Sequence, residues 1–211
     1  MIKVFYSFTE RLLDRQEIAE KITGFSFEIQ QQILRYRNTE DAQRALSGKL
    51  LLRKLFAALN DPRYTLDNIT YNQYSRPQIP GNYDFNISHS GRYCIGVLSD
   101  QGFVGVDVEE ITAINYQDFS FIFTADELAD IQASKLPVQQ FFKYWTQKEA
   151  AIKADGRGMH LPLKKVKIEN DRVSVLGKVF YTRELQLNAN YSCHLASESE
   201  VNEIELQKII L

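Results

Sequence analysis

The chain has little of several residue types that define specialised protein classes. Its two cysteines, Cys94 and Cys193, are too few for a disulfide scaffold or a structural zinc site. We therefore expect both to be free thiols in a reducing compartment, which indicates a cytoplasmic protein. Only ten glycines and five prolines occur in 211 residues, and this excludes collagen-like and low-complexity chains.

The chain also lacks a charge of one sign and a long apolar run. It has 25 basic against 27 acidic residues, whereas proteins that bind duplex nucleic acid usually show a stronger basic bias. Its first residues have no basic flank followed by an apolar run, so no signal peptide is expected. The most apolar stretch, 50–59, is interrupted by Arg53 and Lys54. We expect neither a nucleic acid nor a membrane as partner.

What the sequence does have is an ample supply of core residues. Hydrophobic residues make up 44% of the chain and aromatic residues 12%, which suits one large domain or two small ones. Helical spacing of apolar residues predicts long helices over 39–59, 116–136 and 138–154, with Thr124 as a cap. Short apolar runs predict strands over 2–8, 85–88, 93–98 and 103–108, and two or three more within 165–181 and 190–210.

The order of these elements predicts an α+β fold. Helices and short antiparallel strands occur in both halves, so we expect two similar-sized lobes, 1–104 and 105–211. The segment Ser-Asp-Gln-Gly at 99–102 predicts a hairpin that joins the strands before and after it.

The segment Gly-Val-Asp-Val-Glu, 105–109, is the first candidate site. Because side chains alternate along a strand, Asp107 and Glu109 share one face, and Val104, Val106 and Val108 share the buried one. Two carboxylates roughly 7 Å apart along a strand can converge on a hard cation. The alternative is an edge strand with an acidic, solvated face.

The helix over 141–156 is the second candidate. Trp145, Lys148, Glu149, Ile152 and Lys153 fall on one stripe of it. A stripe that mixes apolar anchors with a carboxylate and two cations suits the wall of a cleft. The alternative is an ordinary amphipathic helix with a Glu149–Lys153 ion pair.

The third candidate is Phe-Asn-Ile-Ser-His-Ser-Gly, 85–91, which we interpret as a strand that runs into a turn. Hydroxyls and an imidazole presented together at Ser88, His89 and Ser90 would form a cradle for an anion. A structural histidine is the alternative. No Gly-x-Ser-x-Gly elbow occurs, so a Ser-His-Asp hydrolase is not indicated. Together the three candidates indicate Mg²⁺ on a pyrophosphate, and no P-loop or dinucleotide motif is present.

These motifs, in this order and at this spacing, resemble the 4′-phosphopantetheinyl transferases of the long, Sfp-type branch. The resemblance rests on FNISHS (85–90), GVDVE (105–109) and FFKYWTQKEAAIKADGRG (141–158). Weaker matches are YSRPQI (74–79) and RYRNTEDAQRALSGKLLLR (35–53), and the whole covers about residues 25–165. It implies two lobes related by a pseudo-twofold axis, each a small antiparallel sheet packed with helices, in a monomer.

The resemblance also implies a reaction. The family transfers 4′-phosphopantetheine from coenzyme A to a serine of an acyl or peptidyl carrier protein, with Mg²⁺, and releases adenosine 3′,5′-bisphosphate. The protein would thus be a holo-[acyl-carrier-protein] synthase. Two other readings remain: an Mg²⁺-dependent phosphodiesterase or nucleotide hydrolase, and a silent homologue that only binds coenzyme A or a carrier.

Residue roles follow from the same resemblance. Asp107, Glu109 and Glu149 would hold Mg²⁺, with Glu149 or Glu109 as general base and Lys153 on the phosphates. Coenzyme A would be bound by a set that joins both lobes: Arg44, Arg76, Ser88, His89, Asp107 and Lys153.

Two further expectations concern recognition. Phe119, Phe121 and Phe123 are candidates for contact with the carrier, and the alternative is that they lie in the core. Ile29 and Gln32 stand where relatives often carry cations. We therefore expect dephospho-coenzyme A to be discriminated less strongly here than in typical relatives.

Overall fold

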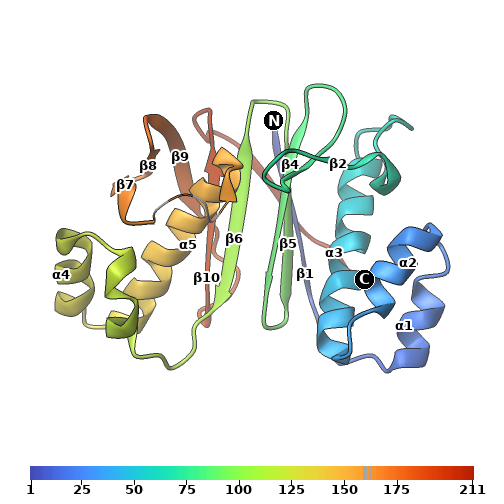
Figure 1. Ribbon diagram of the computed structural model, residues 1–211, viewed down its shortest axis with the longest axis horizontal. Helices are drawn as coiled ribbons and strands as arrows, with labels where there is room; N and C mark the ends of the chain where they lie inside the picture. The colour runs from blue at the N-terminus through green and yellow to red at the C-terminus, as the bar shows by residue number, and fades with distance from the viewer. Residues whose placement is uncertain (159–160, 162) are drawn as a thin grey trace.

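The computed structural model describes residues 1–158, 161 and 163–211 of the chain. Two sheets stand side by side in the middle of the molecule, and helices cover the outer side of each (Figure 1). The first sheet has the order β11-β1-β5-β4, with β1 Ile2–Phe8, β4 Asp84–Ser90, β5 Tyr93–Ser99 and β11 Ile204–Lys208. The second has the order β6-β10-β9-β8-β7, with β6 Val104–Glu110, β7 Val166–Glu169, β8 Arg172–Val175, β9 Lys178–Glu184 and β10 Tyr191–Ser197.

The helices divide between the two lobes. On the side of the first sheet lie α1 Arg15–Lys21, α2 Phe27–Leu34, α3 Thr39–Ala57 and the 3₁₀ turn η1 Leu66–Asn68, followed by the two-stranded ribbon β2 Thr70–Tyr71 and β3 Pro77–Gln78. On the side of the second lie η2 Tyr116–Ile122, α4 Ala125–Ala133, α5 Pro137–Asp155 and η4 Leu163–Lys165. The α+β fold with two lobes is therefore confirmed. Of the described helices, none is both long and apolar enough to cross a bilayer.

Local signals explain where the main helices begin and end. The Asn38 side chain accepts a hydrogen bond from the Glu40 amide at the start of α3. Thr124 caps α4 as predicted, in a capping box with Glu127. This cap also divides the single helix predicted over 116–136 into η2 and α4, because the residue at the cap itself leaves helical geometry. At the other end of α5, Gly156 adopts φ 84° and stops the helix.

The predicted hairpin between 93–98 and 103–108 is wrong. β5 is buried along its whole length and pairs with β1 on one edge and β4 on the other. The hairpin of this region is instead β4–β5, which turns at Gly91, where φ is 52°. The segment 99–102 crosses to the second sheet, where β6 pairs with β10.

The C-terminal region also differs from the expectation of two or three strands. Five strands follow residue 165, and the last of them, β11, returns to the first sheet and pairs with β1 in parallel. The first sheet is therefore mixed rather than antiparallel, because a segment that crosses between lobes can enter in either direction. The division at residue 104/105 stays a prediction, and β11 lies outside the lobe to which it was assigned.

The hydrophobic core has an inner layer between the two sheets. Val4 and Val97 of the first sheet meet Val104, Val106 and Val108 of the second, all with 0% of their surface exposed. The prediction that the three valines form the buried face of β6 is confirmed. It follows that Asp107 and Glu109 face outward from this layer, toward α5. Cys94 and Cys193 are buried free thiols, as predicted.

Candidate functional site

A cavity of about 340 Å³ lies where β4, β6 and α5 meet. Its lining combines three carboxylates with one lysine and one tryptophan, drawn from both lobes: Ile87, Ser88, His89, Asp107, Glu109, Trp145, Glu149 and Lys153. All three acidic residues predicted from the sequence therefore line one cavity, together with Lys153, Ser88 and His89.

A glycine allows α5 to lie close enough to β6 to build this cavity. A Cβ atom at Gly105 would lie 2.1 Å from the carbonyl oxygen of Ala150 and 2.5 Å from the amide nitrogen of Ala154. No side chain fits at such distances, so the backbone of α5 rests directly on the strand. Glu149 and Lys153, on the helix, are thereby held over Asp107 and Glu109.

Asp107 is the most deeply buried of the three carboxylates, with 3% of its surface exposed. Its Oδ1 accepts hydrogen bonds from Lys153 Nζ at 2.7 Å and Ser88 Oγ at 2.9 Å. Burial raises its pKa, and Lys153 opposes that shift. Its second oxygen, Oδ2, is buried and has no hydrogen-bond partner among the described residues.

Glu109 and Glu149 complete the acidic group. Ser90 Oγ donates a hydrogen bond of 2.7 Å to Glu109 Oε2. Burial, followed by the charge of Asp107, raises the pKa of Glu109, and the same two causes raise the pKa of Glu149 to about 7. Glu149 Oε1 is a further buried oxygen without a partner. The pKa of all three carboxyl groups is raised, because each is buried and because Asp107 lies near the other two. A bound cation would stabilise their ionised forms.

The donor chemistry fits a hard divalent cation. All three residues offer carboxylate oxygens, and two of these oxygens are orphaned, on Asp107 and Glu149. Within the described residues, no group of three or more His, Cys, Asp or Glu side chains is positioned to hold a metal ion by itself, and this includes the three carboxylates of the cavity. Mg²⁺ does not require such a group, because it usually takes one or two carboxylates together with waters and substrate phosphates.

The serine and histidine segment lies on a strand and not in a turn, contrary to the sequence interpretation. β4 continues through Ser90, so alternation places Ser88 and Ser90 on one face and His89 on the other. The two hydroxyls donate to Asp107 and Glu109 of β6, whereas His89 is close enough to Arg44 of α3 to feel its positive charge. Burial and Arg44 lower the pKa of His89, which favours the neutral imidazole.

The two arginines predicted to bind coenzyme A, Arg44 and Arg76, are not among the described residues that line the cavity. Arg44 is partly exposed and pairs with Asp41 and, at 3.7 Å, with Glu40 on its own helix. Arg76 is buried, and its guanidinium donates to both oxygens of Asp84 at 2.6 and 2.7 Å. It also donates to the carbonyl oxygens of residues 104 and 153, so it joins the lobes at the C-terminal end of α5.

Lys148 departs from the predicted stripe along the cleft. Its side chain is fully buried, and Nζ lies 2.7 Å from Glu127 Oε2 of α4 and 2.9 Å from the carbonyl oxygen of Val166. The stripe of α5 that begins at Trp145 is wide, so one side of it faces the cavity and the other packs against the η2–α4 segment. The Lys148 side chain lies on the second side and points into the second lobe. Sequence reasoning did not pair Lys148 with Glu127, because the two residues lie on different helices.

The aromatic segment 116–123 divides between core and surface. Phe123 is buried at 1% exposure, whereas Phe121 is exposed at 69%. A second cavity of about 340 Å³ adjoins the carboxylate site here, and Phe119 lines it together with Glu109 and Trp145. An apolar surface therefore leads directly to the acidic group.

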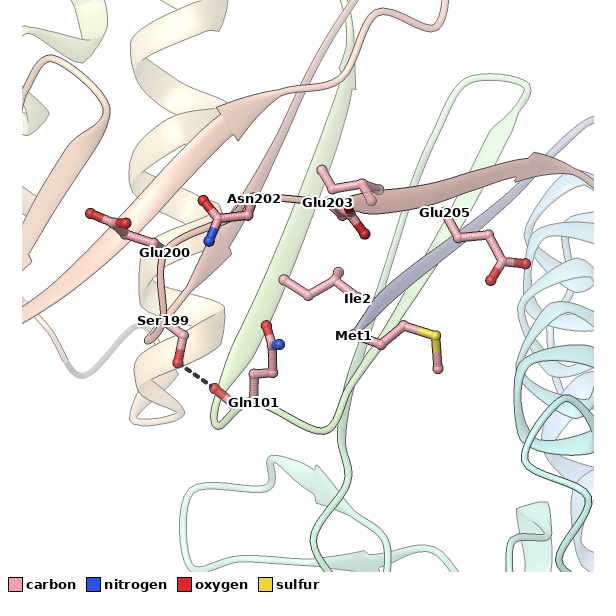
Figure 2. A pocket seen from close by; sticks show the side chains of 9 residues that line it. Met1, Ile2, Gln101, Ser199, Glu200, Asn202, Glu203 and Glu205 are labelled. Carbon is pink, nitrogen blue, oxygen red and sulfur yellow. Dashed lines mark hydrogen bonds between the residues drawn. The ribbon is translucent and has the colours of Figure 1, made fainter.

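A larger groove of about 1140 Å³ lies elsewhere, beside β1 and the segment that links β10 to β11 (Figure 2). Glu200, Glu203 and Glu205 lie along it, and its described lining holds no lysine or arginine. This groove would repel phosphate groups, and it contains none of the predicted site residues.

Comparison with protein families agrees with both halves of this architecture. Residues 103–204 match the model of the 4′-phosphopantetheinyl transferase superfamily. Residues 11–101 match that of the 4′-phosphopantetheinyl transferase N-terminal domain. The two matches together cover β4 and β5 of the first sheet, the whole second sheet and every described residue that lines the cavity.

Individual relatives point to the same family. The 4′-phosphopantetheinyl transferase gsp of Aneurinibacillus migulanus is 34% identical over 181 residues, which covers 83% of this chain and 75% of the relative. The 4′-phosphopantetheinyl transferase Sfp of Bacillus subtilis (strain 168) is 31% identical, over 77% of this chain and 74% of the relative. The L-aminoadipate-semialdehyde dehydrogenase-phosphopantetheinyl transferase of Xenopus laevis is 25% identical, over 76% and 59%. The chain belongs to the 4′-phosphopantetheinyl transferase superfamily, and it is an enzyme of that family.

Proposed function

We propose that this protein transfers 4′-phosphopantetheine from coenzyme A to a serine hydroxyl of an apo acyl or peptidyl carrier protein, with Mg²⁺ and as a monomer. The single observation that carries the proposal is the acidic group of Asp107, Glu109 and Glu149 beside Lys153 in one cavity between the lobes. Two of its carboxylate oxygens are buried and unpaired, which supports a cation that the phosphates of the donor help to hold.

The chain's own residues would act as follows. Asp107, Glu109 and Glu149 would hold Mg²⁺, which supplies charge neutralisation at the pyrophosphate when bound. Lys153 uses one N–H on Asp107 and one on Ser88, so its third N–H is available to a phosphate oxygen. That contact would stabilise the charge that develops as the P–O bond to adenosine 3′,5′-bisphosphate breaks.

Glu149 is the better candidate for the general base. The acceptor hydroxyl must lose its proton as its oxygen bonds to the pantetheine-bearing phosphorus. In the absence of a cation, burial and the charge of Asp107 raise the pKa of Glu149 to about 7, and one of its carboxylate oxygens is buried and unpaired among the described residues, so it can take up a proton. Glu109, in contrast, already accepts a hydrogen bond from Ser90, which favours its use as a fixed ligand.

Recognition would use the rim of the same cavity. Arg44 and His89 stay our proposed coenzyme A ligands, whereas the Ser88 hydroxyl is held by Asp107 and Lys153, and Arg76 would have to leave Asp84 to reach a phosphate. Phe121 and Phe119 stay our proposed carrier contacts, because both are exposed and Phe119 lines the cavity beside Glu109, whereas Phe123 is core.

Intact-protein mass spectrometry of an apo carrier tests the proposal. The carrier is incubated with this protein, coenzyme A and Mg²⁺, and we expect the mass of one phosphopantetheine arm to be gained. The gain should disappear with EDTA and with Asp107→Ala, and it should fall by about 100-fold or more in Glu149→Gln. The exposed Glu28→Gln on α2 is the control and should behave as wild type.

Two other outcomes would replace the proposal. Cleavage of coenzyme A at its pyrophosphate, with no mass gained by the carrier, would indicate a hydrolase. Binding of coenzyme A with no reaction across acyl and peptidyl carriers would indicate a silent homologue.

A further inference from the structure

The boundary between the two sheets has an unusual construction. β4 is the last strand of the first sheet and β6 is the first strand of the second, and they lie side by side (Figure 1). No backbone ladder joins them among the described strands. The N–H groups of β6 that face β4 would therefore be orphaned unless other acceptors were supplied.

Side chains of β4 supply those acceptors at every second position. Four of them each accept one backbone N–H of β6, and donor and acceptor are always 20 residues apart in the chain. The pairs are Val104 N to Asp84 Oδ2 at 2.7 Å, Val106 N to Asn86 Oδ1 at 3.1 Å, Val108 N to Ser88 Oγ at 3.4 Å and Glu110 N to Ser90 Oγ at 3.0 Å. We call these four β4 side chains the side-chain rail.

Two members of the rail also hold the acidic group. Ser88 Oγ donates to Asp107 Oδ1 at 2.9 Å, and Ser90 Oγ donates to Glu109 Oε2 at 2.7 Å. A serine hydroxyl has one proton to donate and two lone pairs that accept. Ser88 uses all three, because it also accepts from Lys153 Nζ at 2.9 Å. Its hydroxyl is therefore committed to the protein.

We propose that the side-chain rail positions the cation ligands, and that Ser88 and Ser90 are positioning residues that orient Asp107 and Glu109 toward a shared divalent ion. The catalytic consequence rests on the proposed function, whereas the orientation of the carboxylates does not.

The physical reason is that each serine hydroxyl hydrogen-bonds to only one oxygen of its carboxylate and leaves the other oxygen available to a cation. Asp107 shows this arrangement, because Ser88 binds its Oδ1 and its Oδ2 has no partner among the described residues. The β6 amide fixes the hydroxyl in turn, so the carboxylate is oriented through two hydrogen bonds that cross the lobe boundary. Without the hydroxyl, Glu109 would keep, among the described residues, only its hydrogen bond with the Trp145 side chain, against the nearby charge of Asp107 that favours turning it away.

Trp145 provides a direct readout, because it is the one tryptophan of the chain and lines the cavity with Glu109 and Glu149. Mn²⁺ is titrated into the protein without coenzyme A while the fluorescence of Trp145 is followed. We expect Ser90→Ala to weaken Mn²⁺ binding about tenfold. Ser90→Thr keeps the hydroxyl and should bind Mn²⁺ nearly as wild type does.

The matched control is Ser197→Ala. Ser197 is fully buried in β10, its hydroxyl accepts the N–H of Ser199 at 3.3 Å, and neither residue lines the carboxylate cavity. Both alanine variants should lose similar thermal stability, but only Ser90→Ala should lose Mn²⁺ affinity. In the transfer assay, Ser90→Ala should raise the Mn²⁺ concentration needed for half-maximal rate more than it lowers kcat.

Three results would overturn the proposal. They are Mn²⁺ binding by Ser90→Ala that equals wild type, a loss of affinity of the same size in Ser197→Ala, and no Mn²⁺ signal in the wild type at all. The two proposals fail separately. If the wild type modifies no carrier but Ser90→Ala alone loses Mn²⁺ affinity, the proposed function fails and the rail stands. If transfer occurs and Ser90→Ala is unaffected in both assays, the rail fails.

Discussion

Each lobe packs one helix of 19 residues against its sheet, α3 in the first lobe and α5 in the second. α3 buries mainly apolar side chains, with Leu51 and Leu55 fully enclosed. α5 instead buries Lys148 completely and turns Glu149, the next residue, into the cavity. A helix that only packs requires an apolar stripe, whereas α5 carries charged groups on two faces that solvent does not reach freely.

Each of these helices lies over a glycine of its sheet, and the two glycines differ in what a side chain added there would meet. A Cβ at Gly96 of β5 would meet the tip of the Leu55 side chain at 2.8 Å. A Cβ at Gly105 of β6 would meet the backbone of α5 at 2.1 Å. Side-chain tips can move and a helix backbone cannot, so the second contact is the rigid one. The predicted site residues of β6 and α5 therefore lie at the more rigid of the two helix–sheet contacts.

The largest expected effect is on stability, from Lys148→Met in α5. Removal of the cation leaves Glu127 as a buried, uncompensated charge, and we expect a loss of about 3–5 kcal/mol in the free energy of unfolding. Urea denaturation measures it. The exposed Lys54→Met on α3 should change stability by less than about 0.5 kcal/mol.

The double variant Lys148→Met/Glu127→Leu sharpens this test. With both charges removed, much of the lost stability should return, since an apolar pair of similar volume can replace a buried ion pair. If Lys148→Met unfolds no more easily than Lys54→Met, the two helices do not differ in the way that we describe.

The two glycines provide the next largest effect. Gly105→Ala should cost about 3 kcal/mol because the methyl group meets helix backbone, and Gly96→Ala about 1 kcal/mol because Leu55 can turn aside. Thermal unfolding compares them. Equal losses would show that α5 can shift away from β6 as easily as a leucine can change rotamer.

A smaller effect should depend on pH. Burial and Asp107 raise the pKa of Glu149 from 4.5 to about 7. The folded protein thus holds this proton more tightly than the unfolded chain, so its contribution is complete below pH 4.5 and is lost as pH rises through 7. Without divalent cations, Glu149→Gln should be more stable than wild type at pH 8 by about 2 kcal/mol, less than the full shift would give because Glu149 is only partly buried.

The pH series itself is the check on that prediction. Urea unfolding in EDTA from pH 4 to pH 8 should show the advantage of Glu149→Gln shrink as the pH falls, while Glu28→Gln follows wild type throughout. An advantage that does not change with pH would mean that Glu149 has an ordinary pKa in the folded protein.

The smallest expected effect concerns the donor, on the side of α3. Ile29 is buried, Gln32 is uncharged, and Arg44 already pairs with Glu40 and Asp41. We expect catalytic efficiency with coenzyme A to exceed that with dephospho-coenzyme A by less than about tenfold, since an exposed ion pair contributes about 1 kcal/mol or less. A strong preference for coenzyme A that Arg44→Ala abolishes would contradict this.

Much of the fold and of the candidate site follows from local patterns. Alternation along 104–110 predicts which side of β6 is apolar, and the spacing along α5 predicts its length to within a residue or two at each end. The alternation of polar residues over 84–90 was available as well, although we interpreted 85–91 as a strand that runs into a turn. An Asp, an Asn and two Ser at every second position of a strand indicate acceptors on one face.

The sequence by itself determined the two long helices, the apolar face of β6 and the residue types that could hold a cation, because each depends on neighbours in the chain. Only the tertiary structure decided that β5 pairs with β4 and not with β6, that Lys148 is buried against Glu127, and that Arg76 joins the lobes. The contacts of Lys148 and Arg76 depend on which buried polar groups find partners, and those partners lie 8 to 77 residues away in the chain.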